Sequence, residues 1–269
     1  MSSQFVSLSG ISSEFELEKI RSICDEEGIS FPVVIGFQVS HSSINRGTQN
    51  DRQPLFSDLG TLDALTRKLG FQSAIHYYTK NIPNLVDDLE CIEGVGVDCS
   101  QALFQFNTLP PLPVFLAQTQ RKGFSILYKV AVANTDNEAG GYAVWMEDAG
   151  TIDARSKNVQ PLLDQVKCAA PFISYAMFDP SHGTDFALDL QPDNLAILFG
   201  EGVMRNHPKL GLVYAGGVKP NTAGQICQLL QHYFPSRASI DIETGIHTGS
   251  RRDFDKIREY LVNCRGLFE

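Results

Sequence analysis

Two turns near the end of the sequence contain the small residues that an anion-binding site requires. Gly216 and Gly217 directly follow the apolar run LVYA. Thr244 and Gly245 follow the next run, ASIDIE, and in both cases a helix-like pattern comes next. Phosphate oxygens must approach main-chain amides closely, so residues around them must be small, and a threonine hydroxyl can donate a further hydrogen bond. The paired placement favours a phosphate site over the alternative that the glycines only form tight turns.

Asp179 is a candidate for acid–base chemistry. It ends the stretch FISYAMFD (172–179), which is otherwise almost entirely apolar. An acidic side chain at the end of a buried strand is difficult to explain by packing, and carboxyl groups serve as general acids in enzymes. The alternative is a helix cap or an ion-pair partner in the following loop.

Eight short apolar runs are candidates for the strands that position these residues. Most are continuously apolar rather than alternating, as expected when both faces of a parallel strand are covered. The predicted strands are 5–10, 31–39, 73–79, 102–107, 125–133, 172–179, 210–217 and 238–245.

Helix signals lie between these runs. Ser13 and Glu16 have the spacing of a capping box, and Gly28 ends the amphipathic pattern that follows. Asn221 and Ser250 are candidate caps for the two helices that follow the glycine turns. A strand–helix unit repeated eight times predicts one α/β domain over residues 1–269, a (β/α)8 TIM barrel. A six-stranded Rossmann-type sheet is the second choice, because no G-x-G-x-x-G follows an early strand.

Two connections are longer than a minimal barrel needs, residues 41–60 after the second strand and residues 135–158 after the fifth. Long loops in a compact domain are either functional lids or tolerated insertions. Both readings are open for these two segments.

Composition narrows the function classes. With 269 residues, 43% of them hydrophobic, the chain can bury a large core, and its net charge of −9 argues against binding to nucleic acid or to an anionic membrane. Six scattered cysteines without ligand spacing predict reduced thiols and no metal site. No leader-like or membrane-spanning run is visible, so we expect a cytoplasmic protein.

The sequence resembles the phosphoribosylanthranilate isomerase family in a series of motifs that covers most of its length. AGGVKPN resembles the family's AGGL-T-P-E-N, and IDIETGIHTGSRRDFDKI resembles its D-V-S-S-G-V-E element and the helix that follows. The other similar stretches, in chain order, are SLSGIS (7–12), IGFQVSHSSINR (35–46), FQFN (104–107), LYKVAVA (127–133) and MFDPSHGTDF (177–186).

The resemblance implies an intramolecular isomerase of tryptophan biosynthesis that performs an Amadori rearrangement of a phosphorylated aminosugar. It implies no metal or organic cofactor, a phosphorylated small molecule as the partner, and a monomer or homodimer. Asp179 would be the general acid, and Arg46 could pair with a substrate carboxylate. The remaining binding residues that it implies are Gly183, Thr184 and Lys129.

The general base is where the sequence departs from the family. Ser9 stands at the position of the family's cysteine, and an unassisted serine hydroxyl is a weak base. Other candidates are the imidazoles of His41, His76 and His182, of which His182 lies close to Asp179 in the sequence and could touch the ligand.

Two acidic residues of the eighth strand add a further question. Asp241 and Glu243 share one face, where Asp241 matches an aspartate of the family and Glu243 needs a basic partner such as Arg251.

Two other functions stay open. The first is a barrel that binds a phosphorylated ligand without turnover. The second is a lyase that forms a Schiff base on Lys129.

Overall fold

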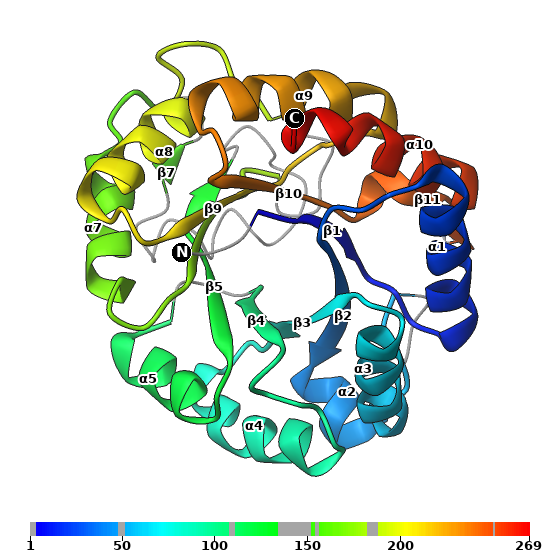
Figure 1. Cartoon of the computed structure of the whole chain (residues 1–269). Coiled ribbons are helices and arrows are strands. Elements are labelled where there is room, and N and C mark those ends of the chain that lie inside the picture. Colours follow the sequence, from blue (N-terminus) through cyan, green and yellow to red (C-terminus); the bar gives the residue numbers. More distant parts are fainter. Residues whose placement is uncertain are drawn as a thin grey trace.

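The computed structural model describes residues 4–47, 52–107, 111–133, 152–153, 156–181, 188–249 and 251–269. Eight parallel strands form a closed barrel, as predicted, and this excludes the open Rossmann-type sheet (Figure 1). In order around the barrel the strands are β1 (Val6–Ser9), β10 (Ala238–Ile242), β9 (Gly211–Tyr214), β8 (Tyr175–Phe178), β5 (Ser125–Lys129), β4 (Leu103–Phe106), β3 (Gln72–Tyr78) and β2 (Val33–Ser40).

Helices surround the barrel in a ring (Figure 1). They are α1 (Glu14–Glu27), α2 (His41–Arg46), α3 (Leu59–Lys68), α4 (Leu85–Gly94), α5 (Pro113–Arg121), α7 (Gln160–Ala169), α8 (Leu195–Asn206), α9 (Pro220–Tyr233) and α10 (Phe254–Asn263). In the described part of the chain, none of these helices has the length and apolar character needed to cross a membrane.

The helix ends agree with the sequence at α1 and differ at α9 and α10. Ser13 accepts a hydrogen bond from the backbone N–H of Glu16, and Gly28 ends the helix at φ 62°. Helix α9 begins one residue before the predicted cap Asn221, with Lys219 as its N-cap. Helix α10 is capped by Asp253, whose carboxylate accepts two backbone N–H groups. The predicted cap Ser250 lies outside the described residues.

Most barrel strands are shorter than predicted, and two of the predicted runs continue into other elements. The apolar run 125–133 leaves the barrel after β5, and its last residues form β6 (Val132–Ala133), which pairs with β7 (Ile152–Asp153) in a separate small sheet. The strand predicted over 238–245 ends at Ile242 and continues into the 3-10 helix η3 (Thr244–Ile246).

The described residues of the segment 41–60 are largely helical. It contains α2, the 3-10 helix η1 (Phe56–Asp58) and the first residues of α3. Ser40 and Ser43 form a capping box that starts α2 directly at the end of β2. Of the other predicted loop, 135–158, only residues 152–153 and 156–158 are described.

The strands separate two apolar clusters. Alternate residues of each strand face either the surrounding helices or the barrel interior, as the pleat requires. Val6 and Leu8 belong to the large cluster under the helices, whereas their neighbour Phe5 belongs to the smaller one. The smaller cluster fills the barrel interior and consists of Phe5, Val34, Ala74, Leu103, Leu127, Tyr175, Met177, Val213 and Ala215.

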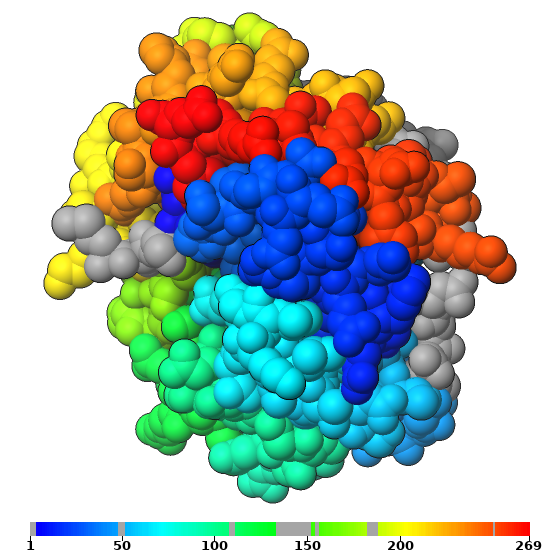
Figure 2. Space-filling model, turned by 45° about the vertical axis from the view of Figure 1, so that its right-hand side comes forward, coloured from blue at the N-terminus to red at the C-terminus, as the bar shows by residue number. Residues whose placement is uncertain are grey.

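The first and last elements of the barrel lie side by side. Strand β1 is hydrogen-bonded to β2 on one edge and to β10 on the other. On the outer surface, α1 lies against α10, and Arg258 of α10 makes ion pairs with Glu26 and Glu27 of α1 (Figure 2). This junction between β1 and β10 closes the barrel.

Candidate functional site

Inside the barrel, a layer of polar residues lies next to the smaller apolar cluster, toward the carboxyl ends of the strands. Its residues stand an even number of positions beyond an interior-facing residue of the same strand, so they also face inward. That residue is Ser239 in β10 and an apolar residue in the other strands. They are Ser7, Ser9, Gln38, His76, Gln105, Lys129, Asp179 and Asp241. All except Gln38 are buried. Catalytic groups of (β/α)8 enzymes occupy this end of the barrel. Burying so many polar groups costs free energy unless each of them is hydrogen-bonded to the protein or to a ligand.

Asp179 stands one residue beyond β8 and forms an ion pair. Lys129, the last residue of β5, donates from Nζ to Asp179 Oδ2 at 2.5 Å. The backbone N–H and the hydroxyl of Ser181 donate to the other oxygen, Oδ1, at 3.0 and 2.7 Å. Lys129, which the resemblance places among the binding residues, therefore contacts the candidate acid.

Ser9 and Asp241 form the second buried contact of the layer. Ser9 Oγ donates to Asp241 Oδ1 at 2.6 Å, and the Ser7 and Ser9 hydroxyl oxygens are 3.5 Å apart. Burial raises the pKa of Asp241 to about 6, although the hydrogen bonds from Ser9 and Ser7 oppose the shift. The position where the sequence predicts a base thus holds a serine bonded to a carboxyl group.

His76 lies next to this pair on β3. A Cβ atom placed on Gly36 would lie 2.7 Å from Ser9 Oγ and 2.8 Å from His76 Nε2, so only glycine fits beside these two side chains. Burial lowers the pKa of His76 to about 4, which leaves the imidazole neutral at physiological pH.

Gln105 is a site residue that the sequence reasoning missed. Its Nε2 donates to Asn107 Oδ1 at 2.6 Å, while its buried Oε1 has no hydrogen-bond partner among the described residues. A buried acceptor without a partner is unfavourable, and a ligand hydroxyl would satisfy it. The available signal was its position two residues beyond Leu103, on the inward face of β4.

Three of the predicted phosphate-binding residues line a pocket of about 530 Å³. Its lining includes Gly217, Thr244 and Gly245 of the two predicted turns, together with Lys219 and Lys256. These lysines oppose a single acidic residue in the lining, Glu259. The pocket therefore combines small residues with a net positive charge, which suits an anion.

Gly245 is sterically required at this pocket. A Cβ atom on Gly245 would lie 2.3 Å from the carbonyl oxygen of Val218, so η3 can rest on the loop after β9 only without a side chain. Gly216 serves a different contact, since its Cβ would lie 3.0 Å from Pro180 and 3.3 Å from Asp179 Oδ1. Its φ of +107° also favours glycine. Gly216 therefore brings the loop after β9 against the candidate acid.

His247 was not predicted and also lines the pocket. Its Nδ1 donates to the carbonyl oxygen of Glu243 at 2.8 Å, because a carbonyl can only accept. Its buried Nε2 has no partner in the described part of the chain. Burial lowers the pKa of His247 to about 4, with the charge of Arg252 adding to the shift. The neutral ring therefore offers an unused acceptor to a ligand.

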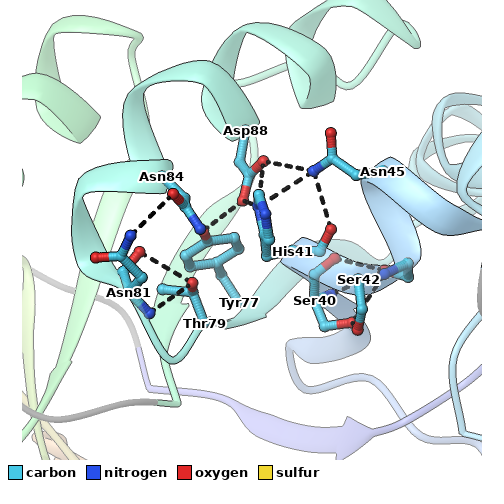
Figure 3. Close-up of polar contacts among 10 residues, drawn as sticks. Ser40, His41, Ser42, Asn45, Tyr77, Thr79, Asn81, Asn84 and Asp88 are labelled. Atoms are coloured by element: carbon cyan, nitrogen blue, oxygen red, sulfur yellow. Dashed lines mark hydrogen bonds and ion pairs between the residues drawn. The ribbon is translucent and has the colours of Figure 1, made fainter.

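A polar cluster around Asp88 of α4 anchors helix α2 (Figure 3). Arg46 is the last residue of α2. Asp88 is buried and accepts hydrogen bonds from His41 Nδ1 at 2.9 Å and from the Tyr77 hydroxyl at 2.6 Å. Asn45 Nδ2 bonds the carbonyl oxygen of His41 at 3.0 Å. His41, a candidate base, thus holds α2 in place, and Arg46 is exposed one residue beyond the cluster.

Glu243 has a different basic partner from the one suggested by the sequence. Glu243 pairs with Arg52, whose Nη1 lies 3.2 Å from Glu243 Oε1, and not with the neighbouring Arg251. The predicted residues His182, Gly183 and Thr184 lie outside the described residues.

Within the described ranges, no group of three or more histidine, cysteine or acidic side chains could hold a metal ion. All six cysteines are free thiols, and Cys91 and Cys168 are the exposed ones.

No protein-family model matches the sequence, and no curated protein matches it. Among solved structures, the chain is similar to N-(5′-phosphoribosyl)anthranilate isomerase from Pyrococcus furiosus, with 14% identity and a TM-score of 0.59 over 97% of this chain and 98% of that one. TrpF from Jonesia denitrificans is similar at 12% identity and a TM-score of 0.56, over 98% of both chains.

A putative fructose-1,6-bisphosphate aldolase from Coccidioides immitis is similar at 10% identity and a TM-score of 0.56, over 97% of this chain and 88% of that one. At such identities the likeness concerns the fold. The chain is therefore a (β/α)8 barrel whose fold is similar to that of phosphoribosylanthranilate isomerases.

Proposed function

We propose that this barrel binds a phosphorylated aminosugar and isomerises it from an aldose to a ketose derivative by an Amadori-type rearrangement. The observation that carries the proposal is the pocket where Gly217, Thr244 and Gly245 meet two lysines, at the same barrel end as two buried carboxyl groups. The pocket would hold the phosphate, and Asp179 and Asp241 would face the sugar.

The acid–base requirement of the reaction supports this assignment. Ring opening needs a proton donor at the ring oxygen, and the rearrangement needs a base at the neighbouring carbon. The Lys129–Asp179 pair offers a donor. Gln105 Oε1, which has no partner among the described residues, offers an acceptor for a sugar hydroxyl. Because the fold is similar to that of N-(5′-phosphoribosyl)anthranilate isomerase, N-(5′-phosphoribosyl)anthranilate is the first substrate to test.

A calorimetric titration tests the binding half of the proposal. Ribose 5-phosphate should bind, whereas ribose should not, because the pocket recognises the anion. The Gly245→Ala variant should bind ribose 5-phosphate about 10- to 100-fold more weakly, the equivalent of one lost charge-assisted hydrogen bond.

Gly224→Ala is the matched control. Gly224 lies within α9, and its added methyl would meet no atom closer than 3.5 Å, so binding should stay within about twofold of the wild type. Equal affinity for ribose and ribose 5-phosphate, or unchanged binding by Gly245→Ala, would contradict the assignment.

Proton NMR of the reacting sugar tests turnover, because it separates the anomeric proton of the aldose from the methylene of the ketose. A second candidate function is a barrel that binds the phosphorylated ligand without turnover. It is favoured by Ser9, whose hydroxyl is bound to Asp241 at the place of the expected base. Binding without any product would select this second function.

A further inference from the structure

Asp179 and Asp241 stand in one row across three strands. Phe178 of β8 is paired with Tyr214 of β9, and Tyr214 with Ile240 of β10. One residue further along each strand come Asp179, Ala215 and Asp241. Since neighbouring strands lie about 4.8 Å apart, the Cα atoms of the two aspartates are separated by about 10 Å.

The residue between the two aspartates is small. Ala215 faces the barrel interior and contributes only a methyl group. Between the two aspartates, β9 therefore presents only this methyl group toward the interior. A separation of this size leaves room for a sugar carbon with an acid on one side and a base on the other.

The two carboxyl groups have different partners. Asp179 accepts from the Lys129 ammonium and from Ser181, so it belongs to an ion pair. Asp241 accepts from the Ser9 hydroxyl, and Ser7 is its register partner on β1. Asp179 thus contacts a proton donor, the Lys129 ammonium group. Asp241 is a carboxyl group bonded to neutral hydroxyl groups.

The environment of Asp241 suits a base. Burial raises its pKa to about 6, and the charge of Asp179 adds to the shift, while the hydrogen bonds from Ser9 and Ser7 and the charge of Lys129 oppose it. A carboxyl group with this pKa is mostly ionised at neutral pH and accepts a proton more readily than an ordinary carboxylate.

The remaining ionisable groups around Asp241 are few. Tyr260 of α10 donates to the backbone carbonyl oxygens of Ser7 and Ile240. His76 of β3 lies near Ser9, the partner of Asp241, beside Gly36. Glu243, two residues further along the chain, is paired with Arg52. Within the described residues, Asp241 is therefore held by hydroxyl groups and makes no ion pair.

We infer that Asp241 is the general base of the isomerisation, with Ser9 as the residue that positions it. The inference rests on the proposed function. The Lys129–Asp179 pair gives a proton to the ring oxygen as the ring opens to the imine. Asp241 then removes the hydrogen of the adjacent carbon, C2.

The step balances without a further reactant. The electron pair of the broken C–H bond forms the C1–C2 double bond, and the C–N π pair moves to nitrogen, which gives an enaminol. A proton returns to C1 and the C2 hydroxyl loses its own proton, which yields the ketose. The reaction takes up no net proton.

The pH dependence of the isomerisation rate of N-(5′-phosphoribosyl)anthranilate tests this assignment. In the wild type, kcat/KM should fall below about pH 6, as Asp241 becomes protonated. Asp241→Asn should lower kcat by about 10²- to 10⁴-fold, the usual size of a general-base contribution. Its affinity for ribose 5-phosphate should stay within about threefold of the wild type, because the pocket is intact.

Ser9→Ala separates a positioning role from a catalytic one. The variant loses a hydrogen bond that lowers the pKa of Asp241, so the acid limb of its pH profile should move to higher pH. Its rate on the alkaline plateau should fall by less than about tenfold, the equivalent of one neutral hydrogen bond. This shift also tests the inference should Asp241→Asn fail to fold.

Three results would overturn the assignment. Asp241→Asn within tenfold of the wild-type rate would show that another group is the base. Ser9→Ala with a loss of kcat as large as that expected for Asp241→Asn, and with an unmoved acid limb in its residual activity, would make Ser9 the base. Ribose 5-phosphate binding by a wild type that forms no product would instead refute the proposed isomerase function, and the base assignment with it.

Discussion

Replacing His76 by glutamine should make the barrel more tolerant of acid. The imidazole is buried, and its pKa falls from 6.5 to about 4 on folding, chiefly because burial penalises the charged ring. The unfolded chain therefore binds a proton more readily than the folded one. The stability contributed by a neutral His76 is complete above pH 6.5 and is lost as the pH falls toward 4.

The size of the effect follows from the two pKa values. At pH 5 the unfolded imidazole is almost fully protonated and the folded one only to about 10%, so this group costs about 2 kcal/mol relative to pH 7.5. Asp241 works in the opposite direction, since its raised pKa adds stability as the pH falls through about 6. A comparison of one protein at two pH values would therefore mix both effects.

Urea unfolding of wild type and His76→Gln, each at pH 7.5 and pH 5.0, isolates the histidine. The wild type should lose about 2 kcal/mol more in free energy of unfolding between the two conditions than the variant does, because Asp241 titrates in both. The reasoning is refuted if the two proteins lose the same stability on acidification.

Two further substitutions test packing and the anchor of α2. Gly60→Ala places a methyl group 1.9 Å from a backbone carbonyl oxygen at the end of α4, so its free energy of unfolding in urea should be lower by about 1–3 kcal/mol. The control is Gly94→Ala, whose methyl meets nothing within 4 Å and should lower the free energy of unfolding by less than about 1 kcal/mol. Similar losses in both variants would contradict this packing. Asp88→Asn should cost about 1–3 kcal/mol, because the Tyr77 hydroxyl and the histidine of α2 lose a carboxylate acceptor. The exposed neighbour Asp87→Asn is its control, and a thermal melt that ranks the two variants equally would count against the anchor.

Local patterns were enough to predict the barrel. A strand buried on both faces has to be continuously apolar, and the eight such runs correspond to the eight barrel strands. Ser13 and Gly28 marked α1 correctly because caps depend on backbone groups within a few residues. The run 125–133 was misjudged, since Val132 and Ala133 are as apolar as β5 although they pair outside the barrel.

The site was only partly predictable, because its contacts join distant parts of the chain. Ser9 and Asp241 are 232 positions apart, and only the closure of the barrel makes them partners. Glu243 was expected to pair with a basic residue near it in the sequence, but its partner Arg52 comes from the segment after α2. Gln105 lies within the motif FQFN, but its role is recognised only once the inward face of β4 is known.

The junction between β1 and β10 has a consequence for biosynthesis. A ribosome releases residues 6–9 long before residues 238–242, so the nascent chain holds Ser9 without its carboxylate for most of translation. The last strand has to insert beside the first before Asp241 can reach the interior. The polar layer at the mouth of the barrel is therefore complete only after this strand has been added, and a chain interrupted before it carries only half of the proton-transfer apparatus.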